Sequence, residues 1–173
     1  AQDGGTAVDF SWGNGEWALN GGGSARRSSN VGTPLGDVAN SQSRSGFGNI
    51  GAAWTGARGF VGASYGYDDT KYGVPVVDEG QIELTPRRHT FSAKAGVSGL
   101  GGFVEGIRAD YASRRYRHEE LFAGEADTRF RNDTDEVNLK VRHRQAGRLT
   151  GTVGAWAMNR NCAASGDDAL SPP

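Results

Sequence analysis

The chain has few of the residues that build a dry protein core, and it has a single cysteine. Hydrophobic residues make up 36% of the 173 residues, and the mean hydropathy is −0.57. The lone Cys162 excludes an internal disulfide and a metal cluster of the paired-cysteine type. No apolar run approaches the roughly 20 residues that a membrane-spanning helix needs. The first ten residues have neither a basic nor an apolar segment, so we expect no signal peptide there.

Charge of one sign is also lacking, whereas glycine and aromatic residues are plentiful. The net charge is −1, and without a strongly basic face the sequence gives no support for nucleic-acid binding. Four Trp, five Tyr and seven Phe are too many for a disordered tail. The 28 glycines are scattered between aromatic residues. This composition favours a single domain of many β-strands joined by turns.

Period-two alternation of apolar and polar residues predicts about eight strands. The clearest strand has Val137, Leu139 and Val141 on one face, with Asn138 and Lys140 on the other. The other strands are predicted at residues 6–12, 17–27, 46–54, 60–67, 81–97, 103–117 and 149–158. Short turns such as Gly13-Asn14-Gly15 separate some of them. Long polar segments are predicted at residues 28–41, 68–80, 118–136 and 161–173.

Connections that alternate short and long are typical of up-and-down barrels in outer membranes. The sequence therefore predicts an all-β fold, an antiparallel up-and-down transmembrane β-barrel architecture with about eight strands. A Lys or Arg on the lipid face costs about 2–4 kcal/mol at the bilayer midplane. We therefore expect Lys140 and Arg142 to face the lumen, and likewise Lys94 and Arg108. Aromatic residues are expected near the rims, as in interface girdles: Trp12, Trp17, Trp54, Tyr65, Tyr67 and Phe103.

Several short segments of the sequence, taken in order, resemble the middle of the β-barrel domain of TonB-dependent outer-membrane receptors. The resemblance spans nearly the whole chain. These segments are Arg26-Arg27, Asn40-Ser41, Tyr72-Gly73-Val74-Pro75, Tyr116-Arg117-His118-Glu119-Glu120, Thr128-Arg129-Phe130-Arg131-Asn132-Asp133, Glu136-Val137-Asn138-Leu139-Lys140, Gly147-Arg148-Leu149-Thr150-Gly151-Thr152-Val153-Gly154 and Gly166-Asp167-Asp168-Ala169-Leu170-Ser171-Pro172-Pro173.

The resemblance implies a 22-stranded barrel that is closed by a plug domain and imports a scarce ligand with energy from TonB. Such ligands include iron–siderophore complexes, cobalamin, metals and glycans. Residues 1–173 are then expected to be a partial barrel domain without plug or closing strands. The implied place is the bacterial outer membrane, and the implied partners are its lipid, TonB, the plug and a small metal chelate. We expect no enzyme activity and no cofactor. In the zinc-uptake branch the loop after the Tyr72-Gly73-Val74-Pro75 segment is rich in His, whereas residues 76–80 contain none.

Candidate ligand-facing residues lie on loops that are expected to face outside: Tyr72, Arg117, His118, Glu119, Glu120 and Asp127. The carboxylates and the imidazole could bind Ca²⁺ or Zn²⁺. Without paired-ligand spacing, a solvated charged loop is the favoured interpretation, and no metal site or catalytic residue is assigned. The neighbouring Arg114 and Arg115 could contact lipopolysaccharide phosphates or anionic chelates. Cross-strand pairing with Asp133, Asp135 and Glu136 is an equal alternative.

Two other functions stay open at this point. One is a complete small barrel of about eight strands with a structural or adhesion role. The other is a hydrolase based on Gly62-Ala63-Ser64-Tyr65-Gly66, which matches the G-x-S-x-G motif. That motif needs a strand–turn–helix context, whereas the alternation continues straight through Ser64 and predicts a strand. A barrel segment on its own would also have two unpaired edge strands.

Overall fold

The computed structural model describes residues 3–75 and 81–166, and all regular structure in them is β-strand. The prediction of an all-β, antiparallel, up-and-down fold is confirmed. Among these residues, no helix has the length and apolarity needed to span a membrane. The strands are β1 Asp3–Gly13, β2 Trp17–Ser28, β3 Gly32–Thr33, β4 Gly36–Asp37, β5 Ser43–Gly56, β6 Gly59–Val74, β7 Ile82–Leu84, β8 Arg87–Ser98, β9 Val104–Phe122, β10 Glu125–Ala146 and β11 Leu149–Gly166.

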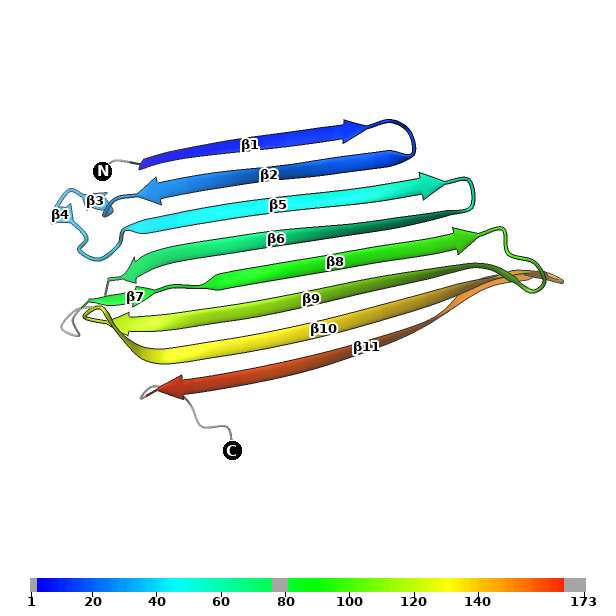
Figure 1. The fold of residues 1–173 in the computed structure, drawn as a ribbon. Helices are drawn as coiled ribbons and strands as arrows, with labels where there is room; N and C mark the ends of the chain where they lie inside the picture. The colour runs from blue at the N-terminus through cyan, green and yellow to red at the C-terminus, as the bar shows by residue number, and fades with distance from the viewer. Residues whose placement is uncertain (1–2, 76–80, 167–173) are drawn as a thin grey trace.

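Nine of these strands form one antiparallel sheet in which neighbours along the chain are neighbours in space (Figure 1). The short β7 continues the line of β8, so both lie between β6 and β9. β3 and β4 form a separate small hairpin. β1 and β11 lie at opposite edges, and each pairs with one neighbour only. The expectation of two unpaired edges is therefore confirmed for the described chain.

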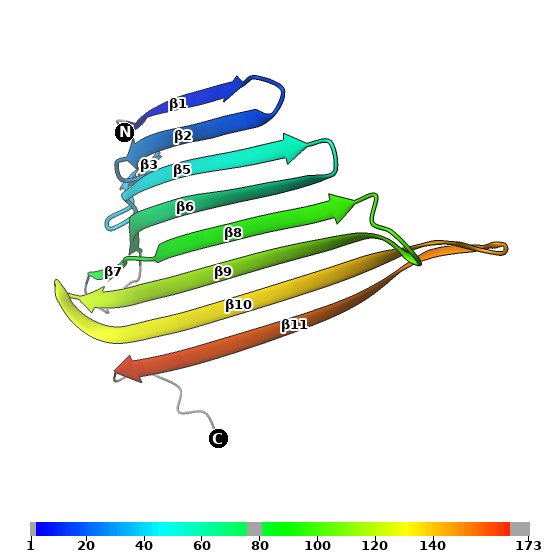
Figure 2. The same cartoon turned by 45° about the vertical axis from the view of Figure 1, so that its right-hand side comes forward.

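The sheet is a single layer without a core. Both views show the strands side by side with nothing stacked on either face (Figures 1 and 2). Among the described residues, no hydrophobic side chain is buried. The solvent-accessible surface is 12112 Å², whereas a compact monomer of 18.2 kDa exposes about 8100 Å². The sheet therefore presents two faces that nothing in this chain covers.

The strand register puts most of the large apolar residues on one of these two faces, whereas Phe47, Phe60, Trp156 and Met158 lie on the other. Directly paired residues share a face, and one such row joins Leu19, Ala52, Ala63, Ala93, Tyr111, Val137 and Ala157. We call this the apolar face, and its larger side chains are Val8, Phe10, Trp12, Trp17, Leu19, Ile50, Trp54, Val61, Tyr65, Phe91, Val97, Ile107, Tyr111, Val137, Leu139, Val141 and Val153. The predicted separation of Val137, Leu139 and Val141 from Lys140 and Arg142 is confirmed.

The two ends of the sheet have different connections. At one end all four are short, at residues 14–16, 57–58, 99–103 and 147–148. The first is stabilised by the side-chain oxygen of Asn14, which accepts a hydrogen bond of 2.8 Å from the Trp17 N–H. The other end carries the long segment 29–42, which includes β3 and β4, and the segment around β7. The predicted short and long connections are therefore present up to β9.

The predicted polar loop at residues 118–136 is wrong. β9 runs to Phe122, β10 begins at Glu125, and only Ala123 and Gly124 join these two long strands. The physical reason is charge complementarity across the pair, since Arg117 contacts Asp133 and Arg129 contacts Glu119. Two other predicted polar segments are also strands in part, since residues 68–74 belong to β6 and residues 161–166 belong to β11. Residues 76–80 and 167–173, which complete the other predicted loops, lie outside the described residues.

The Ala123-Gly124 turn gives a test of the hairpin. Both residues have positive φ, 51° and 91°, as in the type I′ turn that Asn-Gly favours. Alanine in that region costs about 1–2 kcal/mol. We expect Ala123→Asn to slow hydrogen exchange of the amides that flank the turn, and Gly124→Val to speed it. In an irregular loop neither change would alter the exchange.

Candidate functional site

The face opposite the apolar face carries polar and small residues, and we call it the polar face. Its members alternate with those of the apolar face along every long strand. Glycine, serine and asparagine predominate on β2, β5 and β6, whereas cations gather on β8, β9 and β10. The charged members on these last three strands, away from the long-connection end, are Lys94, Arg108, Asp110, Arg114, Glu136, Lys140 and Arg142. The polar face is therefore the candidate functional surface.

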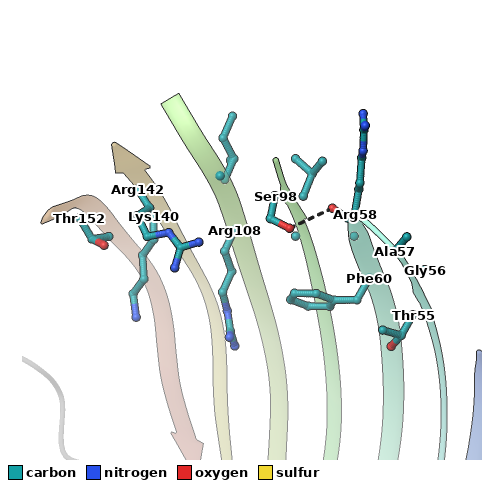
Figure 3. A pocket seen from close by; sticks show the side chains of 15 residues that line it. Thr55, Gly56, Ala57, Arg58, Phe60, Ser98, Arg108, Lys140, Arg142 and Thr152 are labelled. Carbon is teal, nitrogen blue, oxygen red and sulfur yellow. Dashed lines mark hydrogen bonds between the residues drawn. The ribbon is translucent and has the colours of Figure 1, made fainter. Parts of the chain in front are cut away.

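A hollow of about 410 Å³ lies on the polar face at the short-turn end of the sheet. Figure 3 shows the side chains of Arg108, Lys140 and Arg142 next to one another, on β9 and β10, while Arg58 points away from them. We call this the basic hollow. Its lining residues are Thr55, Gly56, Ala57, Arg58, Gly59, Phe60, Gly96, Val97, Ser98, Gly106, Ile107, Arg108, Lys140, Arg142 and Thr152.

Phe60 forms the aromatic part of this hollow. The ring extends from β6 toward β9 (Figure 3) and passes over Gly96, its register partner on β8, and the guanidinium carbon of Arg108 lies 5.7 Å from the ring centre. A Cβ atom at Gly96 would lie 2.5 Å from Cε1 of Phe60, so the ring needs a glycine beneath it. The ring and the guanidinium can gain a modest cation–π interaction, about 0.5–1 kcal/mol at an exposed site. Gly96 therefore determines the position of Phe60, and Phe60 helps to position Arg108.

The cations of the hollow are not all neutralised. Asp110 accepts hydrogen bonds from Nε and Nη2 of Arg108 at 3.0 and 2.9 Å. Glu105 accepts one from Arg142 at 2.9 Å. Lys140 lies directly opposite Arg108 in the register, and it makes no hydrogen bond or ion pair within residues 3–75 and 81–166. The hollow therefore holds an excess of positive charge.

The six candidate residues from the sequence are divided between the two faces near the long-connection end. His118 and Glu120 of β9 and Tyr72 of β6 lie on the polar face, and one register row passes through Tyr72, Leu84 and Glu120. Arg117 and Glu119 lie on the other face, paired with Asp133 and Arg129. Asp127 lies in β10 where the register shifts between Ala126 and Thr128. The expectation that all six lie on loops is wrong, because they belong to paired strands.

His118 has an aromatic environment. Its ring stacks on Phe130 with the centres 4.6 Å apart, and Tyr116 contacts its Nδ1 at 3.2 Å. Its Nε2 is buried without a hydrogen bond, although Oε1 of Glu120 lies 3.4 Å away. In the part of the chain that the structure describes, no three His, Cys, Asp or Glu side chains converge as metal ligands. The geometry therefore gives no support to the Ca²⁺ or Zn²⁺ alternative.

The apolar residues do not extend to the ends of β9 and β10. Toward the turn that joins these two strands, the same side of the sheet carries a network of ion pairs. Asp133 accepts a hydrogen bond from Nε of Arg131 at 2.7 Å and also contacts Arg117. Arg115 donates to Asp135 at 2.8 Å. The hydrogen bond from Arg117, with that from Arg131, lowers the pKa of Asp133 to about 2. The cross-strand alternative for the Arg114–His118 segment is therefore confirmed for Arg114, Arg115 and Arg117.

Sequence reasoning placed Lys140, Arg142 and Arg108 correctly on one face but did not recognise a shared hollow. The available signal was that these cations fall near the same end of two adjacent strands. The contribution of Phe60 depends on the register with Gly96, which the alternation pattern does not reveal. Ser64 lies inside β6, paired with Gly51 and Ser92, so the strand interpretation of that motif is confirmed.

Comparison with protein-family models gives no match, and comparison with curated proteins gives no similar sequence. The resemblance to TonB-dependent receptors stays a prediction. The two faces and the open edges of the sheet are therefore the features that indicate a function.

The pKa of Asp133 predicts a pH dependence of the β9–β10 pair. Because this pKa is about 2 in the folded chain and 3.8 ordinarily, the stabilisation is complete above about pH 4 and is lost as the pH falls through about 2. We expect the difference in unfolding free energy between the native chain and Asp133→Asn to shrink over that range. The measurement is urea unfolding in detergent micelles at several pH values.

Asp37→Asn is the matched control, since Asp37 makes no ion pair in the described chain and lies in the β3–β4 hairpin. A difference for Asp133→Asn that stays constant from pH 5 to about pH 2 would contradict the assignment.

Proposed function

We propose that this sheet is a wall segment of a bacterial outer-membrane β-barrel that takes up a solute. The observation that carries the proposal is a single-layer sheet with a band of apolar side chains across one face, which we call the apolar band, and a polar opposite face that is rich in cations. A membrane is the environment that would cover such an apolar face, and a water-filled lumen would solvate the polar one. The partners on the outside are then outer-membrane lipids.

The shift of the apolar residues from one strand to the next supports an apolar face that meets the membrane. On β1 they are Val8, Phe10 and Trp12, whose register partners on β10 are Asp133, Asp135 and Val137. On β10 the apolar residues begin at Val137, four residues beyond Asp133, the residue in the same register row as Val8. Between β1 and β10 the apolar band is therefore displaced by four residues over six strand-to-strand steps. With about 3.3 Å per residue and about 4.8 Å per step, the band slopes at about 25°. A band parallel to a membrane would thus require tilted strands, as transmembrane barrels have, although their tilt of about 35–45° is larger.

Aromatic residues border the apolar band at both ends. Trp12, Trp17 and Trp54 lie toward the short turns, and Trp17 pairs directly with Trp54. Toward the other end lie Tyr65, Tyr67, Phe91 and Tyr111, with Phe91 and Tyr111 in ring contact at 6.1 Å. Aromatic belts of this kind mark the two membrane interfaces of a barrel. The short turns would then face the periplasm, and the long β9–β10 hairpin the exterior.

The open edges favour a large barrel over a small one. A complete eight-stranded barrel would require β1 to pair with β11, whereas these strands lie at opposite edges. A wider barrel leaves room for a solute and a plug. Together with the sequence resemblance, this supports a TonB-dependent receptor that takes up a metal chelate or a related scarce ligand. The complete small barrel with a structural or adhesion role is the second candidate.

Within this proposal the six candidate residues have different places. Tyr72, His118 and Glu120 lie on the lumen side near the exterior, where a ligand would first enter. Arg117 and Glu119 lie on the outer surface, beyond the apolar band, and would not contact a ligand in the lumen. Asp127 lies near the tip of the extended hairpin.

Paired substitutions on β10 test which face meets the membrane. We expect Leu139→Arg to destabilise the folded protein in lipid by about 2–4 kcal/mol, because it places a charge on the lipid face. Asn138→Arg is the matched control on the neighbouring residue and should change the stability by less than about 1 kcal/mol. Equal effects in unfolding experiments in lipid vesicles would contradict the orientation.

Cysteine labelling in outer membranes is the direct experiment. With Cys162 replaced by Ala, single cysteines at Asn138 and Leu139 are treated with a membrane-impermeant maleimide. We expect the cysteine at position 138 to react from the lumen and the one at position 139 to be protected by lipid. Reaction at both positions would refute the membrane assignment.

The reading frame on either side distinguishes the two candidate functions. A plug domain upstream supports the receptor, and a signal peptide directly before Ala1 supports the small barrel. Loss of uptake of a chelate when the proton gradient is collapsed would support energy supply through TonB.

A further inference from the structure

We infer that the basic hollow is a binding site for a multiply charged oxyanion, such as a phosphate-type or polycarboxylate group. This inference deepens the proposed function and rests on it, since the polar face must line a water-filled lumen for an anion to reach the hollow. It names the chemistry of the solute and places a contact at the short-turn end, far from the candidate residues Tyr72, His118 and Glu120.

The first observation is the placement of like charges. Lys140 and Arg108 are direct register partners on adjacent strands. Like charges in directly opposite positions destabilise a sheet unless something neutralises them. Asp110 is occupied by Arg108, and Lys94 lies directly opposite Asp110 on β8. The carboxylate of Asp110 is therefore shared among three cations, Arg108, Lys94 and Lys140.

The second observation is that the cations are arranged around open space. Arg108, Lys140 and Arg142 line one hollow, and the strand next to β10 contributes Thr152 and the small Gly154 in their register rows. The residue directly opposite Lys140 on β11 therefore has no side chain to fill the space. A guanidinium group fits oxyanions with paired N–H donors, and an ammonium group adds a compact point charge.

The third observation is that the hollow is organised by packing as well as by charge. Phe60 lies over Gly96 and beside the guanidinium of Arg108, which already donates twice to Asp110. Arg108 is therefore held in place before any ligand arrives. A positioned cation loses less side-chain entropy on binding than a free one.

The experiment measures binding of inorganic pyrophosphate to the intact protein in a zwitterionic detergent by isothermal titration calorimetry. We expect saturable binding that Lys140→Gln weakens about tenfold, as for the loss of one charge-assisted contact, and that Lys140→Arg largely preserves. Gly96→Val should also weaken it, without any change of charge, because the new side chain displaces the Phe60 ring.

Arg160→Gln is the matched control, since Arg160 lies on the polar face of β11 toward the other end of the sheet. It should change the affinity less than about twofold. An equal loss with Arg160→Gln, or an absence of saturable binding, would overturn the inference, the first because it would indicate a diffuse positive field. Lys140→Arg guards against misfolding: loss of binding in that variant, with native circular dichroism, also counts against the site.

The outcome separates this inference from the proposed function. If cysteine labelling gives the expected pattern and pyrophosphate does not bind, the lumen wall stands and the anion site is refuted. If pyrophosphate binds as described and the labelling pattern fails, the hollow is an anion site on a surface that is not a lumen.

Discussion

The uncovered apolar face is the constraint on which the rest of this structure depends. A soluble domain buries such a face against a second layer, and the described residues provide none. The sheet therefore has to be held together by its backbone ladders and by side-chain pairs within each face, while the environment covers the apolar side. This explains how a chain with a mean hydropathy of −0.57 can still present a broad apolar surface. Its apolar residues are few, and the strand register places most of them on one side.

Charge has two different uses in the sheet. Beyond the apolar band on β9 and β10, cations and carboxylates pair across the two strands, as Arg115 does with Asp135. These pairs extend the two strands into a long hairpin where the sequence suggests a loop. On the polar face at the opposite end, cations outnumber the carboxylates that contact them, and Lys140 makes no hydrogen bond or ion pair with the described residues. The first arrangement contributes to folding, whereas the second leaves charge for an external group.

The sequence alone allowed the strands and their faces to be predicted because alternation has a period of two, which needs no knowledge of distant residues. The clearest case is Val137 to Arg142, where the apolar and charged faces were both assigned correctly. The errors came from segments in which both faces are polar, such as residues 118–136. There, alternation carries no hydrophobic signal, and a charged strand resembles a solvated loop until its partner strand is known.

Amino-acid sequence by itself determined the all-β fold, the short turns at one end and the separation of Lys140 and Arg142 from Val137, Leu139 and Val141. These follow from local rules of periodicity and turn chemistry. Only the tertiary structure decided the register, and with it the pairing of Lys140 with Arg108, the approach of Phe60 to Gly96 and the division of His118 from Arg117 and Glu119. A contact between strands depends on which residues lie opposite, and a shift of one residue would reverse every such assignment.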